Sequence, residues 1–242
     1  MSSLPSHLLA FDTSTERMSV ALCKGDQIWR YNGAGGAAAS AQLLPVIQSL
    51  MTQANMQWSD LHALVFGRGP GSFTGLRTAC SVAQGLAFGA NLPVLPLDTL
   101  LAVAEDARQQ HGCTQVLAAL DARMDQVYAA RYLHRDGAWL EIDAPALTSP
   151  ESLRLQEGEW LAGNVQDVYG ARLQRHVRAV PSWPEAAAML RLAPALLAQG
   201  CAVPAAQAQP LYVRYKVAQT TAERQLVAAS FASASSSVSA AP

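Results

Sequence analysis

The chain has 242 residues, half of them hydrophobic, which is enough for one large core or for two domains of roughly 100 residues each. Its 17 basic residues are balanced by 18 acidic ones, so the composition excludes the positive field by which a protein holds nucleic acid on its own. The four cysteines lack C-x-x-C spacing and the N-terminus does not resemble a secretory signal, so we expect a cytoplasmic protein.

Two stretches share one pattern of strand, acidic turn and strand. The first is LLAFDTSTERMSVAL at residues 8–22, and the second is VLAALDARMDQVYAA at residues 116–130. When the two are superimposed, Asp12 falls on Asp121, and short apolar runs precede both aspartates. The chain is therefore predicted to contain an internal duplication.

A strand pair and a helix are predicted next. KGDQIWRYN predicts the strand pair, and the flexible stretch GAGGAAAS ends at Ser40, which we expect to be the N-cap of the helix. Apolar residues then recur at intervals of three and four as far as Ala54. Pro45 is expected either to lie in the first turn or to bend the helix.

A glycine-rich loop, GRGPGSFTGLR at residues 67–77, lies between a predicted strand at 64–66 and a predicted helix at 74–88. The loop lacks the G-K-[ST] of a Walker A loop, and Thr74 stands at the third glycine position of a G-x-G-x-x-G loop. Ser72 lacks the flanking glycines of a nucleophile elbow. The glycines therefore predict a tight turn and close backbone packing.

The remaining segments also predict strands alternating with helices. A strand near Val94 completes a parallel strand–helix–strand unit, and a helix at 98–110 joins the halves. Residues 78–97 carry no charge, but glycines and prolines interrupt them, so we expect no membrane span. The second half predicts a strand at 160–162 and helices at 165–173 and 184–199. The Ala/Ser-rich tail beyond Thr220 has too little apolar bulk to fold, and we expect it to be disordered.

The turn after the first strand is the weak candidate for a cofactor site. Actin-like ATPases and sugar kinases place an acidic residue and a glycine against phosphate at such a turn, and here Ser14 takes the place of the glycine. Asp12, Ser14 and Thr15 could meet an anion. A turn held together by its own Asp and Thr side chains is an equally good interpretation.

The spacing of the histidines and acidic residues does not predict a metal site or an acid–base pair. No two of the five histidines are three, four or five residues apart, so no helix offers a paired imidazole face. Asp121, Arg123 and Asp125 predict a salt-bridged turn. We therefore expect neither a metal site nor catalytic residues in this chain.

Small residues form a stripe along the helix predicted at 74–88, namely Gly75, Ala79 and Ala83. Such a stripe lets another helix approach closely. It predicts internal packing more often than an interface with another chain, and the residues alone leave both interpretations open.

Five segments together resemble the bacterial TsaB family: LLAFDTSTERMSVAL, SAQLLPVI, FGRGPGSFTGLRTACSVAQGLAFG, ALDARMDQVYAARY and PLYVR. The resemblance covers residues 8 to about 216. It implies an α/β protein with a duplicated actin-like or sugar-kinase-like fold of the ASKHA, ribonuclease H-like class. Its two subdomains would be residues 1–108 and 109–219, followed by the tail at 220–242.

The resemblance also implies a non-catalytic subunit in tRNA threonylcarbamoyladenosine (t6A) biosynthesis. The catalytic relative, TsaD, is expected to hold ATP and metal and to transfer threonylcarbamoyl to the adenosine beside the anticodon. An ATPase, TsaE, completes the assembly, and tRNA is expected to be met only through the complex. The helices at 40–54 and 74–88 are expected to bind the partner, or a second copy when the partner is missing. The expected contact residues are Leu43, Val46, Ile47, Leu50, Gly75, Ala79 and Ala83.

Two other functions stay open at this point. An ATP-binding phosphotransferase or ATPase of the actin-like class would use Asp12 and the loop at 67–75. A peptidase is more remote, because the sequence offers neither a metal constellation nor a nucleophile constellation.

Overall fold

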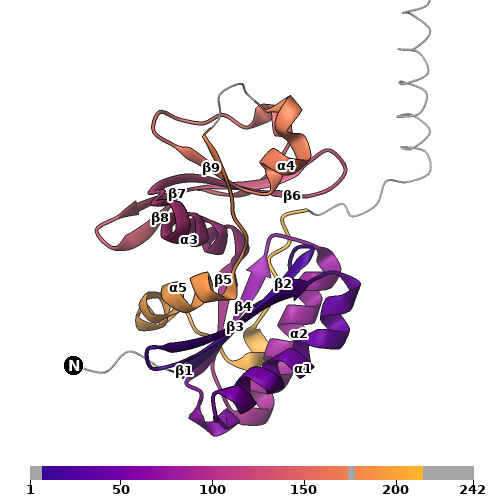
Figure 1. Cartoon of the computed structure of the whole chain (residues 1–242), viewed down its shortest axis with the longest axis vertical. Coiled ribbons are helices and arrows are strands. Elements are labelled where there is room, and N and C mark those ends of the chain that lie inside the picture. The colour runs from indigo at the N-terminus through magenta and orange to yellow at the C-terminus, as the bar shows by residue number, and fades with distance from the viewer. Residues whose placement is uncertain (1–6, 174–177, 215–242) are drawn as a thin grey trace, which may run out of the picture.

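The computed structural model describes residues 7–173 and 178–214, which form two five-stranded sheets (Figure 1). In the first sheet the strand order is β3-β2-β1-β4-β5. Three strands form an antiparallel meander, and β4 and β5 extend it in parallel from β1. The bounds are β1 (His7–Asp12), β2 (Arg17–Lys24), β3 (Gln27–Ala34), β4 (Ala63–Gly69) and β5 (Val94–Asp98).

The second sheet repeats this topology, with the order β8-β7-β6-β9-β10. Again an antiparallel meander is followed by two parallel strands. Asp12 and Asp121 each end the central strand of their sheet, so the predicted internal duplication is confirmed. The bounds are β6 (Gln115–Asp121), β7 (Val127–Arg135), β8 (Ala138–Thr148), β9 (Trp160–Gly163) and β10 (Ala179–Pro181).

Two long helices, α1 (Ala37–Gln53) and α2 (Phe73–Ala90), cover one face of the first sheet (Figure 1). The apolar stripe of each helix faces inward and packs on Phe11 and Phe66 of the sheet. Burial of these side chains is the main stabilising term in this half, at about 25 cal/mol per Å² of apolar surface.

The other two long helices tie the halves together. α3 (Thr99–His111) follows the first sheet but covers one face of the second, whereas α5 (Ala186–Ala198) follows the second sheet and covers the free face of the first. They also pack against each other between the sheets, where Arg191 Nε of α5 donates to the buried Glu105 of α3 at 2.8 Å. Each half therefore depends on a helix from the other.

The remaining face of the second sheet is covered only lightly. Its cover consists of α4 (Val165–Tyr169) and the 3₁₀ turns Pro150–Ser152 and Gly170–Arg172. Further 3₁₀ turns lie at Trp58–Asp60 and Ala205–Gln207.

The first long helix begins earlier than the sequence predicts. α1 starts at Ala37, after Gly36 at φ +62°, and no side chain caps it. Ser40 lies within the first turns and its hydroxyl donates to the Ala37 carbonyl at 3.1 Å, so its assignment as N-cap is wrong. Pro45 lies inside the helix on its exposed side, where the carbonyl that it leaves unbonded can meet water.

Two further predictions about elements need correction, and one edge strand was not predicted. KGDQIWRYN forms a turn and one strand, β3, which pairs back on β2. The sequence did not predict the edge strand β8, because most of its side chains are exposed and its apolar alternation is weak. The helix expected at 165–173 ends at Tyr169, where Gly170 begins a 3₁₀ turn. The tail at 220–242 lies outside the described residues.

Candidate functional site

The turn between β1 and β2 is closed around its own aspartate. Asp12 Oδ1 accepts hydrogen bonds from the backbone N–H of Ser14 at 2.8 Å and from its hydroxyl at 2.7 Å. The carboxylate is only 1% exposed, and its burial raises the pKa of Asp12 to about 6, although the Ser14 hydrogen bonds lower it. Asp12 is thus a buried anchor of the turn and offers no oxygen to a ligand in solution.

The glycine-rich loop seals this turn from outside. A Cβ atom on Gly67 would lie 1.7 Å from Asp12 Oδ2, and one on Gly75 would lie 1.8 Å from the Thr13 carbonyl oxygen. The Thr13 hydroxyl in turn donates to the Gly75 carbonyl at 2.7 Å. Only glycine permits these approaches, so the predicted tight turn with close backbone packing is confirmed.

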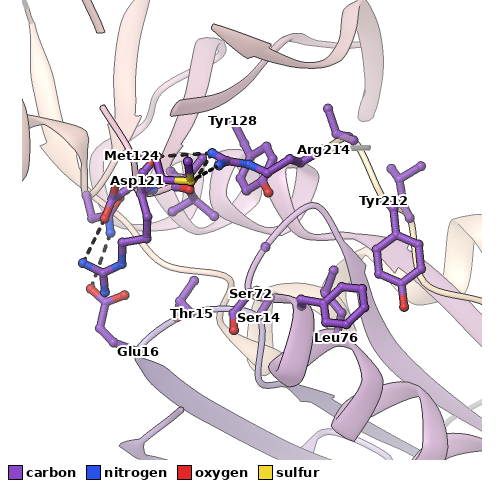
Figure 2. A pocket seen from close by; sticks show the side chains of 18 of the residues that line it. Ser14, Thr15, Glu16, Ser72, Leu76, Asp121, Met124, Tyr128, Tyr212 and Arg214 are labelled. Carbon is purple, nitrogen blue, oxygen red and sulfur yellow. Dashed lines mark hydrogen bonds and ion pairs between the residues drawn. The ribbon is translucent and has the colours of Figure 1, made fainter. Parts of the chain in front are cut away.

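A cavity of about 380 Å³ lies beside this turn, between the two subdomains (Figure 2). Ser14 and Thr15 reach it from one side and the β6–β7 turn from the other, whereas Asp12 does not line it. Its wall combines hydroxyl, amide, aromatic and guanidinium groups. The polar and aromatic side chains in this wall include Ser14, Thr15, Ser72, Phe73, Asp121, Arg123, Tyr128, Asn164, Tyr212 and Arg214.

The β6–β7 turn is the second wall and differs in construction. Arg123, Met124 and Asp125 all have φ near +60°, in the left-handed region of backbone angles that residues other than Gly, Asn and Asp rarely adopt. Asp121 accepts from the Arg123 backbone N–H at 2.8 Å and pairs with its guanidinium at 3.2 Å, while Arg172 pairs with Asp125 at 2.6 Å. The predicted salt-bridged turn is therefore confirmed.

Residues 208–214, named here the C-terminal strap, cross from one subdomain to the other. Near its start the Ala208 carbonyl accepts from Gln84 of α2 at 2.9 Å, and the Leu211 N–H donates to the Arg68 carbonyl at 2.6 Å. At its end, Arg214 donates to the Ala122 carbonyl at 2.8 Å and so holds the β6–β7 turn. Figure 2 shows Arg214 reaching Met124 of the same turn. The strap closes one side of the cavity.

The predicted partner-contact residues require a correction. Leu43, Val46, Ile47 and Leu50 of α1 were expected on a docking surface together with Gly75, Ala79 and Ala83 of α2. Six of these seven are buried against the protein's own sheet, and only Val46 is partly exposed. A helix stripe of apolar or small residues marks the inward face, and here the sheet occupies it. The alternative interpretation of the small-residue stripe, internal packing, was the right one.

The outer faces of the same two helices have an unusual composition. α1 contains no charged residue, and α2 contains only Arg77. Large apolar side chains point outward: Leu44 is 43% exposed and Phe88 is 84% exposed. Most exposed surfaces of soluble proteins carry many charges, so a face with a single charge and exposed Leu and Phe side chains is typical of a docking surface.

Gly85 lies on this outer face of α2, and a Cβ atom there would meet nothing within 4 Å. Glycine inside a helix costs about 1 kcal/mol relative to alanine. Unlike Gly75, Gly85 meets no neighbour among the described residues that would require its lack of a side chain. The sequence reasoning missed this outer stripe, although the absence of charge along α1 was a readable signal for it.

Within the described residues, no helix combines the length and hydropathy that a bilayer crossing requires. Nor do three or more His, Cys, Asp and Glu side chains of these residues gather closely enough to hold a metal ion.

Comparison with known proteins gives consistent results. The family model described as "TsaD: tRNA N6-adenosine threonylcarbamoyltransferase" matches residues 36–235. The chain is 36% identical over 221 residues to the Escherichia coli K12 protein named tRNA threonylcarbamoyladenosine biosynthesis protein TsaB, covering 87% of this chain and 96% of that one. A Haemophilus influenzae protein of the same name is 35% identical over 222 residues, covering 87% and 94%.

A solved structure supports the same grouping. YeaZ from Pseudomonas aeruginosa superimposes with a TM-score of 0.80 at 36% sequence identity, covering 86% of this chain and 99% of that chain. A second solved structure from the same organism, described as having similarity to peptidase YEAZ, gives the same TM-score and identity. The likeness thus extends over nearly the whole of the described fold.

Proposed function

The chain belongs to the TsaB family of t6A biosynthesis proteins and has their duplicated actin-like fold, and from this we propose that it is the non-catalytic subunit that supports a TsaD-like threonylcarbamoyltransferase. The partner docks on the outer faces of α1 and α2. ATP and metal are held by that catalytic partner, a TsaE-like ATPase joins the assembly, and tRNA is met only through the complex in the cytoplasm.

The observation that carries this proposal is the outer face of the two helices. It presents Leu44 and Phe88 to solvent, and Arg77 is the only charge on either helix. Gly85 lowers helix propensity, and no contact within residues 7–173 and 178–214 requires it, whereas a helix of another protein could approach closely there. A soluble protein that functions alone gains nothing from such a surface.

The sealed Asp12 turn supports the non-catalytic part of the proposal. An aspartate that serves a nucleotide or its metal must present an oxygen to the cavity. Here the Asp12 carboxylate is taken up by Ser14 and closed off by Gly67, whose Cα lies too close for any side chain. The turn is built to hold the first subdomain together.

The proposal is tested by size-exclusion chromatography with light scattering on this protein, alone and mixed with the catalytic subunit from the same cell. We expect a heterodimer that restores threonylcarbamoyl transfer, and no transfer by this protein alone. If the catalytic subunit works unaided and no complex forms, the proposal is wrong.

A matched pair of variants locates the interface. Gly85→Trp places a large side chain on the outer face of α2 and should abolish pairing while the protein stays folded. Gln109→Trp puts the same side chain at an exposed position of α3, away from both helices, and should pair normally. Equal affinities for the two variants would place the partner elsewhere.

A nucleotide-binding role is the second candidate, because the cavity between the subdomains is large and partly polar. Its hydroxyl groups and Arg214 could contact an anion. Calorimetry with ATP and magnesium decides it: an enzyme of this class should bind in the micromolar to millimolar range typical of substrates. No comparable feature favours a peptidase.

A further inference from the structure

Arg77 holds a special position on the proposed docking face. It is the only charged residue among the 17 residues of α1 and the 18 residues of α2. It lies one helical turn from Ser81 and two from Gly85, along the same exposed line of α2. A partner that covers these two helices must therefore meet one positive charge among their residues.

The Arg77 side chain is held in place before any partner arrives. Its guanidinium carbon lies 3.8 Å from the centre of the Phe73 ring, and its Nε donates to the Tyr212 hydroxyl at 3.2 Å. The Phe73 and Tyr212 rings lie 5.3 Å apart, so the three side chains form one corner, named here the arginine corner. Such an arrangement removes much of the conformational entropy that an arginine otherwise loses on binding.

The hydrogen-bonding edge of this guanidinium remains available. Within the described part of the chain, Nε is the only Arg77 nitrogen that donates a hydrogen bond to a side chain, and no carboxylate lies within ion-pair distance of it. The two terminal nitrogens can therefore donate two parallel bonds outward, the geometry that matches a carboxylate.

We propose that the arginine corner binds an aspartate or glutamate side chain on the docking surface of the catalytic partner. This inference rests on the proposed function and names one contact within it. Covering Arg77 without an opposite charge would leave a desolvated cation unpaired, which strongly disfavours binding. An apolar partner surface that places one carboxylate at this corner therefore binds favourably. If the same surface docks in a shifted or reversed orientation, Arg77 is left unpaired and binding is weak.

A phosphate of tRNA would offer the same oxygen pair, but the surroundings do not favour it. Affinity for nucleic acid is built from several cations in one region, and α1 and α2 together carry only one, in a chain of net charge −1. Exposed Phe73, Leu44 and Phe88 suit a protein surface instead.

The test measures the affinity of the full-length chain for the intact catalytic subunit by calorimetry, at low and at high salt. Arg77→Gln should weaken pairing at low salt by about tenfold or more and remove most of the salt dependence. Arg77→Lys keeps the charge but not the two-bond geometry, so it should fall between wild type and Arg77→Gln. The matched control is Arg135→Gln, which removes an exposed arginine of the second subdomain and should change neither quantity.

Each result decides between clear alternatives. If wild-type protein forms no complex, the proposed function itself fails. If Arg77→Gln pairs with wild-type affinity and salt dependence, or if Arg135→Gln weakens pairing equally, the inference is overturned while the proposed function stands. If Arg77→Gln lowers only the binding of tRNA to the assembled complex, the corner binds phosphate and the carboxylate assignment is wrong.

A second variant guards against a folding defect in Arg77→Gln. Tyr212→Phe removes the hydroxyl that orients Nε but leaves the guanidinium and the ring contact. It should weaken pairing less than Arg77→Gln, with the salt dependence retained. Thermal unfolding of each variant by circular dichroism should match the wild type, because Arg77 is exposed.

Discussion

The two subdomains share a strand order but differ in what covers them. The first sheet carries α1 and α2 on its outer side, two helices of 17 and 18 residues. At the same places the second sheet has a three-residue 3₁₀ turn and the five-residue α4. Equal topology therefore does not imply equal surfaces, and only the first subdomain offers a broad helical face to another protein.

The two equivalent hairpin turns show a second contrast. Around Asp12 the glycine loop packs so closely that the carboxylate is buried and satisfied from within the turn. Around Asp121 three residues take left-handed backbone angles, and arginines from other elements hold them from outside. One turn is stabilised by close packing, whereas the other is stabilised by ion pairs and the C-terminal strap.

The largest loss of stability should come from a substitution that separates the turn around Asp12 from the glycine-rich loop. In Gly75→Ala the new Cβ would lie 1.8 Å from the backbone oxygen of Thr13, so the sheet and α2 must separate. We expect a loss of about 3 kcal/mol or more in the free energy of unfolding, measured in urea.

The control for this change is Gly85→Ala on the same helix. Its Cβ meets nothing, so the substitution should stabilise the protein by about 0.5–1 kcal/mol through helix propensity. If both variants shift stability in the same direction, the inner and outer faces of α2 have been assigned wrongly.

The next largest effect on stability comes from the buried charge of Asp12. Because the pKa in the folded state is raised to about 6 from 3.8, the folded protein binds this proton more tightly than the unfolded chain does. Stability from this group is therefore greatest below about pH 4 and is lost as the pH rises towards 6. Asp12→Asn cannot ionise but can still accept from Ser14, so it should be more stable than wild type by about 2 kcal/mol at pH 8.

The comparison with Asp121→Asn sharpens this prediction. Asp121 accepts hydrogen bonds from Arg123 and from Tyr169 in a half-exposed turn. Its replacement by asparagine should therefore lower the free energy of unfolding by about 1 kcal/mol at pH 8. Urea unfolding of each variant across pH 4–8 measures both. A stability difference between Asp12→Asn and wild type that does not change with pH would refute the buried-charge account.

A smaller loss of stability is expected when the β6–β7 turn is no longer bonded to the C-terminal strap. Arg214→Met removes the hydrogen bonds to the carbonyls of Ala122 and Arg123 but keeps much of the side-chain bulk. We expect about 1 kcal/mol of destabilisation. Amide hydrogen exchange should become faster in residues 122–126 and remain unchanged around Asp12. Faster exchange in both turns would show that the strap holds the whole cavity together.

The smallest effect concerns the start of α1. Since Ser40 bonds the Ala37 carbonyl inside the helix and does not cap it, Ser40→Ala should change stability by less than about 0.5 kcal/mol. Loss of a true N-cap would cost about 1 kcal/mol. Thermal unfolding distinguishes the two, and a loss of the larger size would restore the original assignment.

Local patterns in the sequence predicted much of the fold. The matching segments around Asp12 and Asp121 gave the duplication, and α2, α3 and α5 lie close to their predicted positions. Edge strand β8 escaped prediction because exposed strands carry a weak alternation. The cap of α1 was misplaced because a serine near a helix start serves a cap or an internal bond equally well.

The candidate site was harder to predict. Periodicity identified a stripe through Gly75, Ala79 and Ala83, but a stripe does not say whether its neighbour is the same chain or another. The cavity also depends on Arg214, which lies more than 90 residues along the chain from the turn that it holds. No local pattern reports such a contact.

The sequence by itself determined the duplicated pattern, the single charge on the two long helices and the need for glycine in the loop, because each depends on residues close together in the chain. The tertiary structure decided which helix face is buried, how Asp12 is sealed, and how α3 and α5 cross between the sheets. These depend on contacts between distant segments, where packing selects among the several faces that local patterns allow.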